Sequence, residues 1–274
     1  MERSDSQSFA AADSAGLLSL AAGDVHLWLA YQDEIGGDTL LARYRAMMSA
    51  PEREQEGRFH FARDRHRYLV TRALVRTVLS RYAPVAHRDW RFATNDYGRP
   101  EIANILPQQA GLSFNLSHTQ GLIVLGVTRA CSLGVDVEHV RSRTVSIEIA
   151  DRFFAPEEVS ALALVPAQRQ QDRFFEYWTF KESYIKARGM GLSLPLDRFS
   201  FHYAHEHAVG IAIHSELGDD PARWRFWQFK PTELHLVAVC AERSVSAAQE
   251  IAVRRVVPLV HDTWVEPRFL RTSA

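Results

Sequence analysis

The sequence is poor in cysteine, because Cys131 and Cys240 are the only two among 274 residues. They lie far apart, each inside a strand-like segment. Two such residues cannot build the disulfide framework of a small secreted domain, and they lack the paired spacing of a zinc site. The simplest interpretation is a protein of the reducing cytoplasm.

The sequence also lacks an excess charge of either sign and any long apolar run. The formal net charge is −1, so no overall field attracts nucleic acid or an anionic membrane. Residues 1–24 are rich in Ser, Ala and Asp, and Asp13 and Asp24 bracket their one mildly apolar stretch. They resemble neither a signal peptide nor a membrane span, and we expect a poorly ordered lead-in.

Three sequence motifs typical of other enzyme classes are absent: a phosphate-binding glycine loop, a Gly-x-Ser-x-Gly elbow and a His-Glu-x-x-His zinc helix. The composition that remains is ordinary for a globular protein, with 46% hydrophobic and 24% charged residues. The length suits one large domain or two small ones.

Each half of the chain shows the same order of predicted elements: a strand, then helices, then several short strands. In the first half the segments are a strand at 25–31, a helix at 38–47, a longer helix that Pro84 ends, and strands at 112–116 and 122–127. In the second half they are a strand at 131–139, a helix opened by Pro156, a long helix at 167–188, strands at 199–203, 211–214, 224–229 and 234–240, and one more within 251–260. This order predicts an α+β fold rather than a βαβ series.

The most informative stretch runs from Trp178 to Gly189 and predicts the end of the long helix, which Gly189 stops. At about 100° per residue, Phe174, Trp178, Lys181 and Ile185 share one face of this helix. Glu182 and Lys186 lie along the margin of that face as an i,i+4 pair. An ion pair on the surface of an amphipathic helix explains this spacing as simply as a functional site does.

A second informative stretch is Leu133-Gly134-Val135-Asp136-Val137-Glu138-His139, which has the composition of a strand. Because side chains alternate along a strand, Asp136 and Glu138 share one face. A solvated strand face is one interpretation. The other is a cation between the two carboxylates, because like charges so placed repel each other. Glu182 would add a third carboxylate and complete an oxygen ligand set suited to Mg²⁺.

Four motifs in this order resemble the 4′-phosphopantetheinyl transferases, most closely the pseudo-dimeric Sfp-type members that activate carrier proteins of peptide and polyketide synthases. The motifs are Gly98-Arg99-Pro100, Asn115-Leu116-Ser117-His118-Thr119, Gly134-Val135-Asp136-Val137-Glu138, and Trp178 to Ala187 followed by Gly191-Leu192-Ser193-Leu194-Pro195-Leu196. The resemblance implies two similar half-domains related by a pseudo-twofold axis, each an antiparallel sheet packed with helices. The active site would lie in the cleft between them. We expect an N-terminal half-domain at 25–132, a C-terminal half-domain at 133–262 and a tail at 263–274.

The resemblance also implies a reaction. Such enzymes move 4′-phosphopantetheine from coenzyme A to a serine of an apo acyl or peptidyl carrier protein and release 3′,5′-ADP. Asp136, Glu138 and Glu182 would bind one Mg²⁺, or Mn²⁺ in its place. With Asp136 as a catalytic ligand, Glu182 or a water it orients would take the serine proton, and Lys186 would neutralise the departing phosphate.

Contacts to coenzyme A are implied for a set of mostly basic side chains. The set is Arg58, Arg67, Arg99, Pro100, Ser117, His118, Lys181 and Lys186. Solvated helix arginines and a surface loop histidine are the simpler interpretation of several of them. Lys181 lies about 100° around the helix from Glu182, so it would contact the phosphate or the carrier from another side. Gln55 departs from the family, which commonly has lysine there, and this puts one contact in doubt.

Two other classes of function remain open: a protein that binds coenzyme A or a carrier without catalysis, and a magnesium-dependent nucleotide hydrolase. The intact carboxylates and Lys186 argue against the first. The second would cleave coenzyme A without an acceptor. We expect a carrier to dock on the loop at 141–160, where Arg143 and Arg152 would meet its acidic helix. We further expect a monomer, without nucleic acid or membrane as partner.

Overall fold

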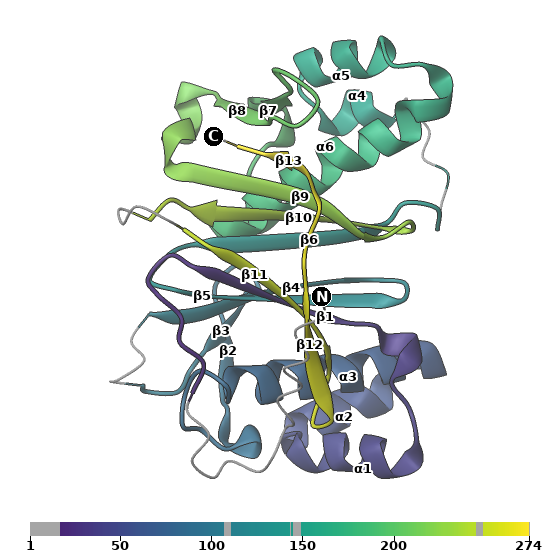
Figure 1. The fold of residues 1–274 in the computed structure, drawn as a ribbon, viewed down its shortest axis with the longest axis vertical. Helices are drawn as coiled ribbons and strands as arrows, with labels where there is room; N and C mark the ends of the chain where they lie inside the picture. Colours follow the sequence, from purple (N-terminus) through teal and green to yellow (C-terminus); the bar gives the residue numbers. More distant parts are fainter. Residues whose placement is uncertain (1–16, 107–110, 143, 145–148, 245–248, 274) are drawn as a thin grey trace.

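The computed structural model describes residues 17–106, 111–142, 144, 149–244 and 249–273. Figure 1 shows two lobes stacked along the long axis of the molecule. Each lobe is a sheet covered by helices on its outer face, and the two sheets face each other in the middle. This confirms the expected α+β class with two half-domains.

The first lobe contains the expected strand–helix–strand order. Its elements are β1 (Val25–Ala30), α1 (Asp38–Met47), α2 (Ala50–Arg58), α3 (Ala62–Leu79), β2 (Phe92–Thr94), β3 (Pro100–Ile102), β4 (Leu112–Thr119) and β5 (Leu122–Arg129). The start of α2 shows why a helix forms there. Ser49 and Glu52 make a reciprocal capping box, and Pro51 occupies the first turn, where it removes no hydrogen bond.

The second lobe repeats the order. Its elements are β6 (Leu133–His139), α4 (Ala150–Phe153), α5 (Pro156–Ala163), α6 (Ala167–Arg188), β7 (Phe199–His202), β8 (Gly210–Ile213), β9 (Trp224–Thr232) and β10 (His235–Glu242). As expected, α6 ends at Gly189, whose φ of +68° places it in the left-handed conformation that stops helices.

The C-terminal strands do not follow the expected division into half-domains. Strands β11 (Ile251–Val257) and β12 (His261–Val265) return to the first lobe, whose sheet has the order β12-β11-β1-β5-β4. Strand β13 (Phe269–Thr272) then joins the second sheet, ordered β13-β9-β10-β6. The expected tail thus contains a strand, and the first sheet is mixed because β1 and β11 pair in parallel. The expected lead-in lies mostly outside the described residues, but Leu20 is buried in the first core.

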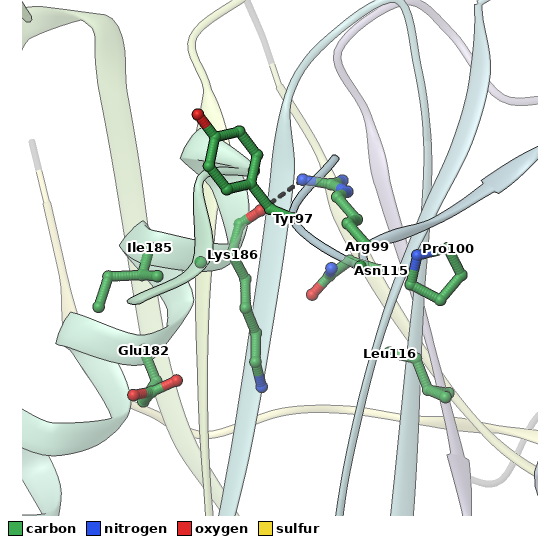
Figure 2. A pocket seen from close by; sticks show the side chains of 11 residues that line it. Tyr97, Arg99, Pro100, Asn115, Leu116, Glu182, Ile185 and Lys186 are labelled. Carbon is green, nitrogen blue, oxygen red and sulfur yellow. Dashed lines mark hydrogen bonds between the residues drawn. The ribbon is translucent and has the colours of Figure 1, made fainter. Parts of the chain in front are cut away.

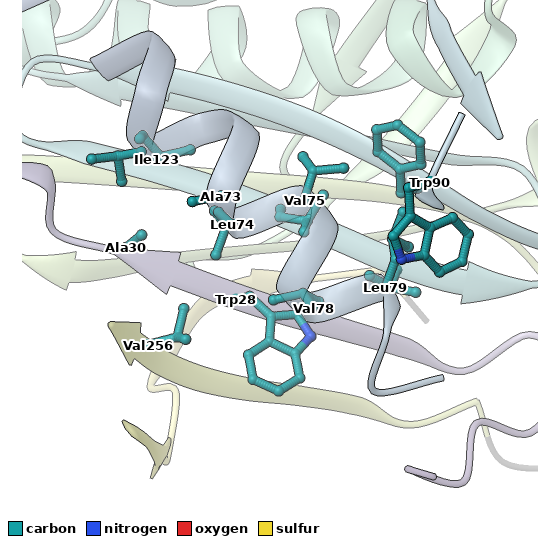
Figure 3. Close-up of a cluster of buried hydrophobic side chains, with 14 of the residues drawn as sticks. Trp28, Ala30, Ala73, Leu74, Val75, Val78, Leu79, Trp90, Ile123 and Val256 are labelled. Carbon is teal, nitrogen blue, oxygen red and sulfur yellow. The ribbon is translucent and has the colours of Figure 1, made fainter. Parts of the chain in front are cut away.

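The buried side chains form three apolar layers, one within each lobe and one between the two sheets. In the first, Leu74 and Val78 of α3 pack over Trp28 of β1, as Figure 3 shows. The second lies between the sheets and includes Val135 and Val137 of β6. The third lies between α6 and the second sheet. Each fully buried aliphatic side chain contributes about 1.5–3 kcal/mol, so these layers dominate the stability of the fold. Within the described ranges no helix is long and apolar enough to cross a bilayer.

Candidate active site

The site forms where α6 lies directly against β6. Gly134 permits this contact, because a Cβ there would stand 1.9 Å from the carbonyl oxygen of Ser183 and 2.4 Å from the amide nitrogen of Ala187. Only glycine leaves room for the backbones to approach so closely. The approach sets Lys186 beside Asp136. The glycine of the Gly-Val-Asp-Val-Glu stretch is therefore a packing requirement that the sequence pattern contained but did not explain.

Asp136 is the centre of the cluster and is only 5% exposed. Its Oδ1 accepts hydrogen bonds from Lys186 Nζ at 2.7 Å and from Ser117 Oγ at 3.0 Å. Its Oδ2 is buried and has no hydrogen-bond partner among the described residues. A buried carboxylate oxygen without a partner costs free energy, so this atom is where a ligand is expected.

Lys186 completes the cluster, but not in the predicted way. We expected an i,i+4 pair with Glu182, whereas the ammonium bonds to Asp136 and donates to Val135 O at 3.1 Å and Ser117 Oγ at 3.0 Å. The partner supplied by the tertiary fold displaces the one nearby in sequence. The side chain of Lys186 is a quarter exposed, so it still reaches the surface of the pocket.

Glu182 lies beside this pair without an ion pair of its own among the described contacts. Burial raises the pKa of its carboxyl group, the negative charge of Asp136 raises it further, and Lys186 acts in the opposite direction. Glu138 follows Asp136 by two residues on β6, as expected, and is half-buried. The described residues nevertheless contain no group of three His, Cys, Asp or Glu close enough to hold a metal ion. The expected cage of three carboxylates is therefore not formed.

A pocket of about 270 Å³ opens beside the cluster, between the β2–β3 turn, β4 and the end of α6. Figure 2 shows the side chains that line it. They are Tyr97, Arg99, Pro100, Asn115, Leu116, Glu182, Ile185 and Lys186, with Gly98, Gly189 and Gly191. Four expected site residues, Arg99, Pro100, Glu182 and Lys186, thus share one cavity. Tyr97, Asn115, Leu116 and Ile185 were missed as site residues, although the last three lie within the motifs and Tyr97 directly precedes one.

Arg99 fastens the β2–β3 turn to the second lobe. Its guanidinium donates from Nη1 to the carbonyl of Lys186 (Figure 2) and from Nη2 to that of Leu133 at 3.0 Å. Burial lowers its pKa. Asn95, at the start of the same turn, donates to the carbonyl of Gly189 at 3.1 Å. Both side chains cap carbonyls at the end of α6, where the helix dipole is negative.

His118 of β4 and Arg67 of α3 lie near the cluster. His118 was expected in a connection, but β4 extends through it. Partial burial lowers the pKa of its imidazole, as do Arg67 and Lys186, while Asp136 and Asp64 act in the opposite direction. These interactions place Arg67, His118 and Lys186 around one region. Arg67 also pairs with Asp64 at 3.0 Å, and Arg58 forms a 2.6 Å pair with Glu54 at the exposed end of α2, apart from the pocket.

Lys181 does not belong to this site. Its side chain is 0% exposed and pairs at 2.7 Å with Glu158, which is equally buried. It donates in addition to the carbonyls of Leu196 and Phe199, both at 2.7 Å. The structure therefore argues against the expected contact with coenzyme A, because no part of the ammonium faces solvent. The sequence carried the signal, since Lys181 shares the apolar face of α6 with Phe174 and Ile185.

Comparison with known proteins identifies the family. Residues 132–240 match the model of the 4′-phosphopantetheinyl transferase superfamily, and residues 38–129 match that of the 4′-phosphopantetheinyl transferase N-terminal region. The chain is 36% identical over 199 residues to 4′-phosphopantetheinyl transferase Sfp of Bacillus subtilis, covering 73% of this chain and 84% of that protein. It is 34% identical over 176 residues to 4′-phosphopantetheinyl transferase HetI of a Nostoc species, covering 64% of this chain and 73% of that protein. The chain belongs to the 4′-phosphopantetheinyl transferase superfamily and is of the Sfp type.

Proposed function

We propose that this protein transfers 4′-phosphopantetheine from coenzyme A to a serine hydroxyl of an apo carrier protein and releases 3′,5′-ADP. The observation that carries the proposal is the half-satisfied Asp136. One oxygen is held by Lys186 and Ser117, and the other is buried without a partner among the described residues, in a carboxylate that interacts electrostatically with Glu182. A charged cluster left incomplete next to a pocket is suited to a ligand that brings its own charge.

A divalent cation fits this cluster with fewer protein ligands than expected. Mg²⁺ keeps several waters and is commonly held by one or two carboxylates together with substrate phosphates. Asp136 Oδ2 and the carboxylate of Glu182 would hold it directly, and Glu138 would contribute through a water. When bound, the ion would neutralise negative charge on the pyrophosphate. Mn²⁺ has the same preference for oxygen ligands and is an alternative.

The side chains of the protein would supply the remaining chemistry. Attack on the β-phosphorus depends mainly on positioning and on neutralising charge. Lys186 would neutralise the charge that develops on the departing phosphate. Glu182, or a water that it orients, would accept the serine proton.

Contacts to coenzyme A divide between the two sides of the cluster. Arg99 and Pro100 line the pocket, and Ser117 and His118 follow the lining residue Leu116 on β4, from where they would approach the phosphates. Arg67 lies close enough to His118 to lower its pKa, and with Arg58 it would receive the 3′-phosphate.

The carrier protein would belong to a polyketide, peptide or fatty-acid synthase and would dock near residues 141–160. Arg143 lies outside the described residues. Arg152 is exposed on α4, with Phe153 exposed beside it. A basic and an apolar side chain together suit an acidic, amphipathic helix. We also propose a cytoplasmic monomer, because the two lobes already provide both sides of the site.

The decisive experiment measures the intact mass of an apo carrier protein incubated with this protein, coenzyme A and Mg²⁺, with and without EDTA. We expect a gain of one phosphopantetheine that EDTA abolishes. Coenzyme A consumed without carrier modification would instead indicate the hydrolase. Coenzyme A bound but unchanged, with carriers of both the fatty-acid and the peptide-synthetase type, would indicate the protein that binds without catalysis.

A further inference from the structure

Where the edge strands of the two facing sheets lie side by side, side chains join them instead of a backbone ladder. Strand β4 is the last strand of the first sheet and β6 the last strand of the second. Alternate residues of β4 accept hydrogen bonds from alternate amides of β6. The three bonds are Val135 N to Asn115 Oδ1 at 2.8 Å, Val137 N to Ser117 Oγ at 3.2 Å and His139 N to Thr119 Oγ1 at 3.2 Å.

Side chains also satisfy the carbonyls along the same edge of β6. Leu133 O accepts from Arg99, and Val135 O accepts from Lys186. An open strand edge normally exposes unpaired amides and carbonyls that invite pairing with another chain. Here five side-chain contacts cover that edge, and all come from the pocket or from the strand beside it.

Asp136 lies in the middle of these contacts. The amides of its neighbours, Val135 and Val137, are both held by β4, so the backbone of Asp136 is fixed on each side by the opposite lobe. Asn115 holds the first amide through Oδ1 and Ser117 holds the second through Oγ. The position of the Asp136 carboxylate therefore depends on side chains of β4 that do not touch it, in addition to Ser117, which does.

We propose that Asn115 and Thr119 are positioning residues, which set the place of Asp136 by binding the backbone of β6 across the junction of the lobes. This inference rests on the proposed transfer reaction for its effect on rate. The hydrogen bonds from the amides of β6 to Asn115 and Thr119 do not depend on that reaction. Asn115 binds the amide of Val135, directly next to Asp136, whereas Thr119 binds the amide of His139, farther along β6. Removing Asn115 should therefore lower the rate more than removing Thr119.

Four variants test the proposal. Asn115→Leu and Thr119→Val remove the acceptor while keeping a similar shape, and Thr119→Ser restores it. Ser113→Ala is the matched control: Ser113 precedes Asn115 by two residues on the same strand and makes no hydrogen bond to β6 among the described residues. The rate of carrier modification and amide hydrogen exchange of the 133–139 segment are measured for each.

We expect kcat to fall about 10-fold or more in Asn115→Leu and about 3-fold in Thr119→Val, with KM for coenzyme A changed by less than about 3-fold. Exchange at 133–139 should accelerate in both, and Thr119→Ser and Ser113→Ala should behave like the wild type. A rise in KM with unchanged kcat in Asn115→Leu would overturn the proposal, because it would make Asn115 a direct ligand of coenzyme A. Unchanged exchange in both acceptor-deleted variants would overturn it as well. A wild-type protein that modifies no carrier would refute the proposed function, while the exchange data would still decide whether the bonds exist.

Discussion

Helix α6 carries two lysine–carboxylate pairs, five residues apart, that look alike by distance alone. Lys181 Nζ lies 2.7 Å from Glu158, and Lys186 Nζ lies 2.7 Å from Asp136. Both lysines come from one conspicuous stretch of sequence. One pair belongs to the framework of the second lobe, and the other lies at the pocket between the lobes.

The pairs differ in how fully their hydrogen-bonding capacity is used. Lys181 has three bonds for its three donors, to Glu158 and two carbonyls. Both oxygens of Glu158 also accept from backbone amides, those of Ala155 and Phe201. In the other pair, Oδ2 of Asp136 has no hydrogen-bond partner within the part of the chain that the structure describes.

For these two pairs, completeness and burial distinguish the structural pair from the pair at the pocket, whereas distance does not. A fully satisfied buried network fixes a conformation and leaves nothing for a substrate. A network with a free buried oxygen is unstable by itself and gains most from a ligand. This difference can be tested by changing each pair separately.

The largest effect is expected from Asp136→Asn. The amide keeps the shape but cannot supply a negative charge to a cation or to Lys186. We expect the rate of carrier modification to fall by about 10³-fold or more, equivalent to about 4 kcal/mol of transition-state stabilisation. Circular dichroism and the melting temperature should stay close to the wild type. Magnesium-dependent activity retained in this variant would contradict the assigned role.

Lys181→Met should show the opposite pattern. It leaves the Glu158 carboxylate buried without its counter-charge, which typically costs about 3–5 kcal/mol of unfolding free energy. The check is chemical denaturation together with kcat measured on the folded fraction, which should change little.

The double variant Lys181→Met/Glu158→Leu provides the control for this result. Replacing both members of a buried pair by apolar side chains is often neutral or stabilising. Most of the lost stability should therefore return. If kcat falls with Lys181→Met and does not recover in the double variant, Lys181 contributes to the reaction after all.

The local patterns of the sequence were reliable guides to local structure. Alternation predicted β6 with Asp136 and Glu138 in it, and Gly189 predicted the end of α6. Each depends only on neighbours along the chain. The motifs also predicted that Arg99, Glu182 and Lys186 lie at one site, and all three line the same pocket.

What could not be predicted depends on distant parts of the chain. The return of β11 to pair with β1 joins residues more than two hundred positions apart. Lys186 pairs with Asp136 instead of with Glu182, because α6 and β6 lie in close contact at Gly134. No pattern within a single segment encodes which strand edge a side chain will meet.

A smaller effect is expected from Lys186→Met, and it should depend on pH. Loss of one group that stabilises developing charge typically costs about 10²-fold in kcat. Lys186 also lowers the pKa of Glu182, which burial and Asp136 raise. If Glu182 must be ionised to accept the serine proton, the rate falls as the pH drops through this raised pKa. The acidic limb of the pH–rate profile should thus lie at a higher pH than for an ordinary glutamate. It should move to a still higher pH in Lys186→Met. A limb that stays in place, measured from kcat/KM between pH 4 and 9, would separate Glu182 from the proton transfer.

The smallest effect is expected from Arg99→Lys, which keeps the charge and changes only the geometry. The guanidinium reaches one carbonyl on α6 and another on β6, those of Lys186 and Leu133. A lysine ammonium is a single point charge and does not reproduce this planar fork. We expect KM for coenzyme A to rise about 3- to 10-fold, equivalent to about 0.7–1.4 kcal/mol, with KM for the carrier unchanged. Arg129→Lys is the matched control, because Arg129 also donates to a carbonyl, that of Leu20, outside the pocket. If Arg99→Lys binds coenzyme A as the wild type does, a positive charge alone suffices at this position, and the pocket keeps its shape without the fork.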